Sequence, residues 1–360
     1  MNEKQYFLVF FLVVGMLLGS AATLSYIEDP GGAFSDNTYE GGIANILLSG
    51  HNVANVKNYD ERLLQKDVIK NDRRKIDVIV LGSSRSMQLR SSEFSGQTFF
   101  NHGVSGASIE DHIAILDLYQ EKGTIPKTII IGVDPWILNA NNNQNRWTSL
   151  KQEYQNGIAR ICSTSLQYNP DSENIGSNID RYFSLISRPI IIASIMEIFR
   201  ESYYPTDCDE LDVAVRLKDG AFSDPSSSRI KTIGQIDSSA NEYANRNPIY
   251  SLGNFTYIDK DSKTRFESTI HYLKTKNVTV ILFLPPYHPI VYQKMKTDSR
   301  YMIVGEVERY FKDFALMENI QTVGSYDPNL LNLSSIDFYD GQHPSRETIK
   351  KIFAEVNISK

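Results

Sequence analysis

The sequence predicts an α/β domain in which helices cover both faces of a five-stranded parallel sheet, preceded by one N-terminal transmembrane helix. Three observations support this. The chain contains five short runs of mainly apolar residues, stretches with helical periodicity separate these runs, and residues 6–27 contain no charged side chain. Strands that are apolar on both faces are typical of parallel sheets buried between two layers of helices.

The uncharged N-terminal segment is long enough to cross a bilayer, which takes about 20 apolar residues. Lys4 precedes it and two acidic residues follow it, a distribution that favours a cytoplasmic N-terminus. We therefore expect residues 1–27 to form a signal anchor of a single-pass protein of the cell membrane. Small residues at 19–22 also allow a cleaved signal peptide and a secreted protein. In both cases residues 28–360 are expected to be extracytoplasmic.

The five strands and the helices between them are predicted from local patterns. Residues 76–81 (IDVIVL) are rich in β-branched side chains and end at Gly82, which is typical of a buried strand. Ser108 can cap the first helix of the domain. Further strands are expected at 98–101, 127–132, 278–284 and 320–323, and helices at 108–122, 263–276, 298–318 and 345–356.

Two segments depart from this alternation of strands and helices. Residues 28–75 are polar and contain Pro-Gly-Gly and Gly-Gly breakers, so we expect a linker with a short helix near 59–70. Residues 139–260 are rich in Asn, Ser, Tyr and Asp and would form an insertion within the domain 76–360. Because ligands bind at the carboxyl ends of strands in open α/β sheets, an insertion after the third strand could cover a site. A decorative or oligomerising insertion is the alternative.

Composition and cysteine usage restrict the partners and cofactors. A net charge of −6 argues against nucleic acid, because phosphate binding needs a clustered basic surface. Cys162 and Cys208 could form a disulfide in an oxidising compartment, or could be two buried thiols. The scattered histidines show no ligand spacing with a carboxylate, and no glycine-rich phosphate loop follows a strand. We therefore expect neither a metal nor another cofactor.

Polar residues that could carry chemistry follow three predicted strands and precede the last helix. A serine hydroxyl becomes an effective nucleophile when a base takes its proton, and the base needs a carboxylate to orient it. Asp340 and His343 lie three residues apart in one turn and could both face Ser84 across the sheet edge. The segments are GSSRS at 82–86, NHGVSG at 101–106, GVDPW at 132–136 and DGQH at 340–343.

Taken together, these segments resemble the SGNH (GDSL-like) hydrolase superfamily. The shared order is a strand followed by G-x-S, then N-x-G-x-x-G, then a third block with a glycine, and finally D-x-x-H before a closing helix. The resemblance covers residues 76–136 and 278–354. It implies a flavodoxin-like (SGNH-type) three-layer sandwich.

The resemblance also implies roles for individual residues. Ser84 matches the nucleophile, with Ser83 where many members have Asp, and His343 matches the base with Asp340 as its partner. Gly106 matches the glycine whose backbone N–H, together with that of Ser84, binds the oxyanion. Four residues after the strands, two of which match family blocks, are candidate contacts to a substrate. These are Arg85, Asn101, Asp134 and His288, although His288 could equally serve to pack its loop.

One position departs from the family pattern. The third block usually contains an Asn that donates to the oxyanion, and this chain has Asp134 there. A carboxylate cannot donate unless it is protonated, and loss of one oxyanion donor costs about 10²–10³-fold in rate. The GSS start and the altered third block resemble the divergent membrane-anchored members, such as the D-alanine transfer protein of teichoic-acid modification and the alginate O-acetylation proteins.

The resemblance therefore implies a serine-dependent esterase or O-acyltransferase acting on an envelope carbohydrate or polymer. An envelope polysaccharide or acylated polymer would be its substrate, and a membrane acyltransferase could be its partner. A non-catalytic accessory or binding protein on the same fold is the alternative, with Asp134 as its main support. A lipid-directed hydrolase is a third hypothesis, because a membrane anchor would keep the site near lipid.

Overall fold

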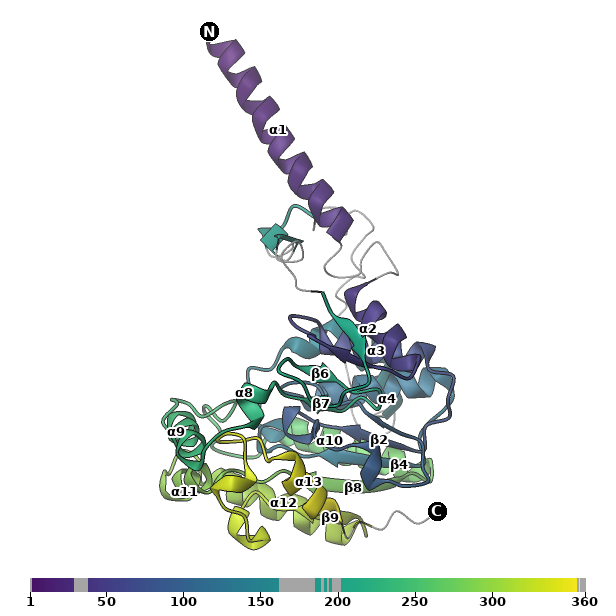
Figure 1. Cartoon of the computed structure of the whole chain (residues 1–360), viewed down its shortest axis with the longest axis vertical. Coiled ribbons are helices and arrows are strands. Elements are labelled where there is room, and N and C mark those ends of the chain that lie inside the picture. The colour runs from purple at the N-terminus through teal and green to yellow at the C-terminus, as the bar shows by residue number, and fades with distance from the viewer. Residues whose placement is uncertain are drawn as a thin grey trace.

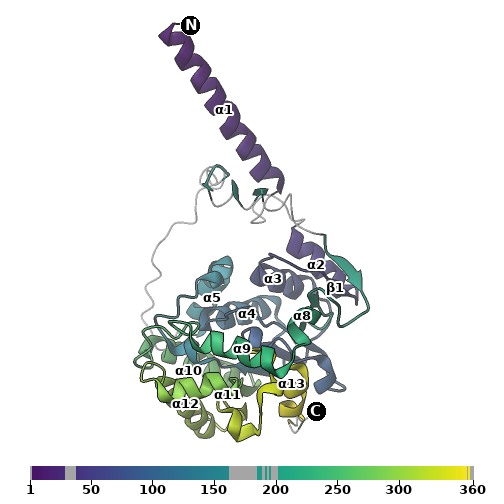
Figure 2. The same cartoon turned by 60° about the vertical axis from the view of Figure 1, so that its left-hand side comes forward.

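The structure is a computed structural model that describes residues 2–28, 38–161 and 202–354, with short stretches at 185–188, 191–192, 194–195 and 356. It is a mixed α/β structure with a five-stranded parallel sheet and a four-stranded antiparallel sheet (Figure 1). One long apolar helix, α1 (Glu3–Glu28), stands apart from the other elements in both views (Figures 1 and 2).

The five predicted strands are all present and form one parallel sheet in the order β3-β2-β4-β8-β9. Successive residues of each strand face opposite sides. Strands β2, β3 and β4 are buried on both sides, which explains their apolar runs, whereas the edge strand β9 exposes Gln321 and Thr322. Leu81 pairs with Ile131 near the carboxyl ends of the two central strands. The strands are β2 (Val78–Leu81), β3 (Phe99–Asn101), β4 (Thr128–Gly132), β8 (Thr279–Leu284) and β9 (Gln321–Gly324).

Helices cover both faces of this sheet. On one face, Ile79 and Leu81 belong to a large core together with α4 (Ile109–Lys122), α10 (Lys260–Thr275) and α12 (Ile303–Met317). On the other face, a smaller core contains alternate strand residues and the closing helix α13 (Arg346–Phe353). Side chains cap several of these helices, as the Ser345 hydroxyl does for α13 by accepting from the N–H of Thr348.

Helix α1 is long and apolar enough to cross a membrane, judged by its length and composition. Its apolar side chains are largely exposed; Phe11 and Leu17, for example, are 67% and 65% exposed. Such a helix is consistent with a membrane anchor or a signal sequence. The prediction of an N-terminal apolar helix long enough to cross a membrane is therefore confirmed.

The segment expected to be a linker with one short helix contains more structure than predicted. The expected helix is α3 (Glu61–Asn71), but α2 (Tyr39–Leu48) and β1 (Asn52–Ala54) precede it. Strand β1 lies inside the antiparallel sheet, whose order is β5-β1-β6-β7. A three-residue strand gives no reliable local signal, because its partners lie about 150 residues away in the sequence.

The other strands of the antiparallel sheet come from the segment expected to be an insertion, residues 139–260. They are β5 (Tyr204–Thr206), β6 (Val215–Arg216) and β7 (Phe222–Ser223). The segment contacts the loop after β2, because the N–H of Phe222 donates to the carbonyl of Met87 over 2.9 Å. It also contains α5 (Lys151–Ile161), α8 (Ser226–Arg229) and α9 (Ile233–Ala244).

The predicted pairing of Cys162 with Cys208 stays a prediction. Cys208 is exposed, and Cys162 lies outside the described residues.

Candidate active site

The structure brings together the serine, the histidine and the aspartate that the sequence singles out. Ser84 begins a 3₁₀ turn directly after β2, and the Ser83 side chain caps this turn by accepting from the N–H of Arg85. The Oγ of Ser84 lies 3.0 Å from Nε2 of His343. The other ring nitrogen of His343, Nδ1, lies 2.8 Å from Oδ2 of Asp340. Both distances suit hydrogen bonds in a serine–histidine–aspartate chain.

The turn before α13 holds the Asp340 carboxylate in place. Its Oδ1 accepts from the backbone N–H groups of Gln342 and His343, each over 2.9 Å. A carboxylate next to Nδ1 favours the tautomer that carries its proton on that nitrogen. The free electron pair of Nε2 then faces the Ser84 hydroxyl, as a general base requires.

Electrostatics increase the basicity of His343. Burial lowers the pKa of His343, but the charge of Asp340 and its hydrogen bond outweigh burial, so the pKa is raised above its usual value. Burial alone would raise the pKa of Asp340, and the opposing effects of His343 and of the N–H donors hold it well below its usual range. Asp340 is therefore ionised wherever His343 titrates, so it can stabilise a protonated imidazole.

The predicted oxyanion donors are the backbone N–H groups of Ser84 and Gly106. Neither the N–H of Ser84 nor that of Gly106 has an acceptor among the described residues. Gly106 adopts a left-handed backbone with φ +58°, and a Cβ there would lie 2.3 Å from both Nη2 of Arg146 and the hydroxyl of Tyr250. The left-handed conformation favours glycine at this position, whereas the nearby atoms are ends of flexible side chains that could move.

Asp134, at the position of the expected asparagine, forms a buried ion pair. Its Oδ1 accepts from Nη1 of Arg85 over 2.7 Å, and the two side chains are at most 1% exposed. Burial raises the pKa of Asp134, while the Arg85 guanidinium opposes this shift. While it is ionised, the Asp134 carboxylate cannot replace the amide donor of the expected asparagine.

Arg85 joins three segments of the site rather than facing solvent. Its Nη2 donates to the carbonyl of Pro285 over 2.6 Å, and its Nε donates to the carbonyl of Gln342 over 3.0 Å. The guanidinium also stacks on the ring of Tyr287, 3.8 Å from its centroid. Arg85 therefore ties the serine turn to the turn that carries His343, and its donors are not directed at an open surface.

Asn101 and His288, predicted as candidate substrate contacts, are also fully buried. The Asn101 amide nitrogen donates to the carbonyls of Ser86 and Leu89, each over 3.0 Å, and supports the loop after Ser84. Nδ1 of His288 accepts from a backbone N–H in the first turn of α11 (Pro289–Thr297) over 3.2 Å. Direct contact with a substrate would require exposure, so both side chains have supporting positions here.

Two residues of the segment 139–260 also reach the site, and the sequence analysis did not identify them. The hydroxyl of Tyr243, on α9, donates to Oε1 of Gln342 over 2.6 Å. Asp224, which follows β7, lies close enough to contribute to the raised pKa of His343. No local motif marks either residue, because only the tertiary fold places them beside the His343 turn.

No group of three or more His, Cys, Asp or Glu side chains in the described part of the chain is arranged to hold a metal ion.

Comparison with known sequences places the chain in one family. The model of the family described as "Protein of unknown function (DUF1574)" matches residues 48–354. The match includes the complete parallel sheet and the turns that carry Ser84 and His343, and it excludes α1. No curated protein matches the chain. Because the match spans most of the sequence, this chain is a member of the DUF1574 family.

Proposed function

We propose that this protein is a serine-dependent esterase or O-acyltransferase of the SGNH type that acts on an envelope carbohydrate or polymer. The observation that carries the proposal is the hydrogen-bonded chain from Ser84 through His343 to Asp340. A histidine held between a serine hydroxyl and a carboxylate is the arrangement that activates serine in acyl transfer.

The geometry suggests the following sequence of steps. His343 Nε2 takes the hydroxyl proton as Oγ of Ser84 attacks the ester carbonyl, and the backbone N–H groups of Ser84 and Gly106 donate to the oxyanion. The tetrahedral intermediate collapses, His343 returns the proton to the leaving alcohol, and the acyl group stays on Ser84. Water or an acceptor hydroxyl then attacks the acyl-enzyme, with His343 again taking the proton, and Ser84 is regenerated.

The strand arrangement supports the SGNH assignment. Numbered along the chain, the strands of the parallel sheet have the order 2-1-3-4-5, which is that of flavodoxin-like folds. Ser84 and Gly106 follow the first two of these strands, β2 and β3, at their carboxyl ends. In open α/β sheets this edge is where ligands bind.

A non-catalytic accessory or binding protein is the second candidate function. It is favoured by one observation, the commitment of Asp134 to Arg85, which leaves the site without the asparagine donor of the family. Loss of one such donor slows catalysis by about 10²–10³-fold. The two candidates differ in whether Ser84 is chemically activated.

Covalent labelling tests this difference. We expect a fluorophosphonate probe to label the full-length protein in detergent and to lose this labelling in Ser84→Ala and in His343→Ala. The matched control is Ser299→Ala, since Ser299 is exposed on the turn after α11, and this variant should be labelled like the wild type. The labelled residue would be identified by peptide mass spectrometry.

Absence of labelling in a folded wild-type protein would favour the accessory function. Equal labelling of the wild type and of Ser84→Ala would assign the reactivity to another residue. A cooperative thermal transition in every variant shows that loss of labelling is not loss of folding.

We further propose that residues 28–360 are extracytoplasmic and that α1 anchors them in the membrane. The support is the uncharged segment 6–27 with Lys4 before it. Alkaline phosphatase fused to the C-terminus should be active, because this reporter works only after export. A fusion that is inactive as phosphatase, while green fluorescent protein at the same position fluoresces, would contradict this topology. Recovery of a mature chain starting near Thr23 would show cleavage instead of anchoring.

A further inference from the structure

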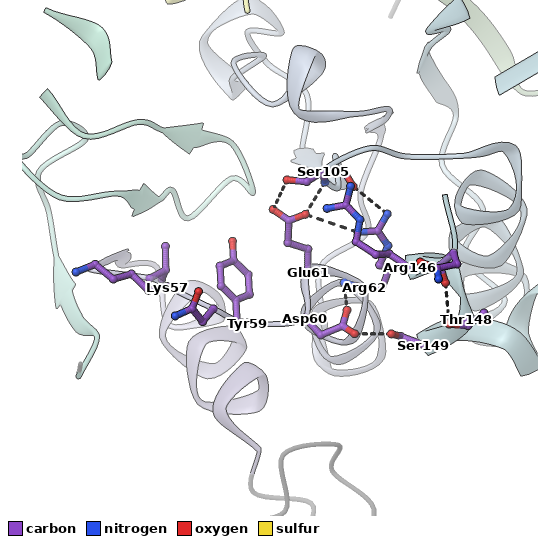
Figure 3. A pocket seen from close by; sticks show the side chains of 12 residues that line it. Lys57, Tyr59, Asp60, Glu61, Arg62, Ser105, Arg146, Thr148 and Ser149 are labelled. Atoms are coloured by element: carbon purple, nitrogen blue, oxygen red, sulfur yellow. Dashed lines mark hydrogen bonds and ion pairs between the residues drawn. The ribbon is translucent and has the colours of Figure 1, made fainter. Parts of the chain in front are cut away.

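An open pocket of about 610 Å³ lies beside the turn that carries Gly106 (Figure 3). Residues 56–62, which lead from β1 into α3, form one wall, and Ser105 forms a second. The third wall is built by Asn145 together with the 3₁₀ helix η4 (Arg146–Leu150). The pocket therefore lies between residues 56–62, the turn that contains Ser105 and Gly106, and the segment 139–260.

The pocket and the candidate oxyanion site share one turn of the backbone. Ser105 lines the pocket and directly precedes Gly106. Arg146 also lines the pocket, and its Nη2 lies 2.3 Å from the position that a Cβ of Gly106 would occupy. A molecule in the pocket would consequently contact the turn whose Gly106 N–H is the proposed oxyanion donor.

Helix α3 holds the shared turn rigidly. The Glu61 carboxylate accepts from the backbone N–H of Ser105 and, over 3.1 Å, from its hydroxyl. The Arg62 guanidinium donates to the Ser105 carbonyl over 3.0 Å and pairs with the buried Asp111 over 2.9 and 3.0 Å. The contacts of Glu61 and Arg62 with Ser105 are visible in Figure 3, and together with the Arg62–Asp111 pair they preform the floor of the pocket.

The carboxylates of the pocket already have partners, whereas Arg146 has only neutral ones. Asp60 caps α3 by accepting from the N–H of Arg62 over 2.8 Å, and it also accepts from the Ser149 hydroxyl. Arg146 is exposed, and its Nη2 donates to Oε1 of Gln144 over 3.2 Å and to the Tyr250 hydroxyl over 2.8 Å. Among the described residues, no carboxylate forms an ion pair with it. Arg146 is thus a positioned cation without a counter-charge in the described part of the chain.

From this arrangement we propose that the pocket binds a hydroxyl-rich segment of the substrate polymer, with Arg146 contacting an anionic group on it. A guanidinium binds carboxylates and phosphates through paired N–H donors. The hydroxyls of Ser105, Thr148 and Ser149 donate within the protein, to Glu61, to the carbonyl of Asn145 and to Asp60. Their oxygens can still accept hydrogen bonds from the hydroxyls of a sugar or polyol. The volume is in the range of small-molecule sites, about 300–1,000 Å³. The inference rests on the proposed function for the position of the ester, but binding itself requires no catalysis.

The binding experiment therefore uses full-length Ser84→Ala protein in detergent, which cannot turn over the probes. Isothermal titration would measure the affinity for a galacturonic-acid oligomer, a glycerol-phosphate oligomer and a neutral dextran oligomer. We expect an anionic oligomer to bind more tightly than dextran. Adding Arg146→Gln should lower the affinity for the anionic oligomer about tenfold. Arg146→Lys should lower this affinity less, because lysine keeps the positive charge. Arg309→Gln, an exposed arginine on α12, is the matched control and should bind like its parent.

Each outcome decides the inference. Tight binding of only one anionic oligomer supports the inference and identifies the anionic group that Arg146 contacts as a carboxylate or a phosphate. It is overturned if dextran binds as tightly as both anionic oligomers, if neither anionic oligomer binds, or if Arg146→Gln changes no affinity. Arg146-dependent binding in a protein whose Ser84 is never labelled would retain the pocket and reject the catalytic function. Thermal unfolding of each variant separates lost binding from lost folding.

Discussion

Replacing Asp340 with Asn should slow ester turnover about 10⁴-fold, as expected when the orienting carboxylate of a catalytic triad is lost, and should also move the pH profile. Turnover requires neutral His343, so kcat/KM should rise with pH through the pKa of this residue. In the wild type that pKa is raised, because Asp340 outweighs the effect of burial. The rise should therefore be centred above the ordinary value of about 6.5. In Asp340→Asn the lowering effect of burial loses its largest opposing charge, so the rise should move to lower pH.

The measurement is kcat/KM for a soluble acetyl ester between about pH 5 and 9, where a histidine base titrates. Glu318→Gln provides a matched control, because Glu318 also faces a histidine, the exposed His271, at 3.2 Å. This control should change neither the rate nor the profile. An Asp340→Asn variant with an unchanged pH midpoint would show that His343 is not the group whose titration limits turnover.

Replacing Arg85 with Met should lower the free energy of unfolding by about 3–5 kcal/mol, because it leaves one partner of a buried ion pair without its counter-charge. Asp134 would lose its only cationic partner among the described residues, and the carbonyls of Pro285 and Gln342 would lose their donors. The Tm should fall by roughly 10 °C. Differential scanning calorimetry of the full-length protein in detergent would measure this.

The double variant Arg85→Met with Asp134→Leu should recover much of this stability, because removing both charges avoids an unpaired buried ion. Arg300→Met is the matched control, since Arg300 pairs with Asp298 over 2.6 Å on the exposed surface and should barely affect the Tm. If the double variant is no more stable than Arg85→Met alone, the unpaired carboxylate is not the cause of the loss.

The fold of the parallel sheet could be predicted because its signals are local. The central strands are buried on both faces, so their own sequences are mainly apolar, as in IDVIVL at 76–81. Helix starts such as Ser108 are likewise marked by the capping residue itself. In contrast, β1 and its partners β5 and β6 pair over long sequence separations, and two- or three-residue strands have no periodicity to detect.

The sequence by itself determined the apolar N-terminal helix, the five parallel strands and the candidate turns with Ser84 and with Asp340 and His343. These features depend on residues close together in the chain. Only the tertiary structure decided that Arg85 neutralises Asp134, that Tyr243 braces the Gln342 turn and that Arg146 lies against Gly106. Such pairings depend on distances between segments far apart in sequence, and whether a charge meets a partner or stays free is settled by packing alone.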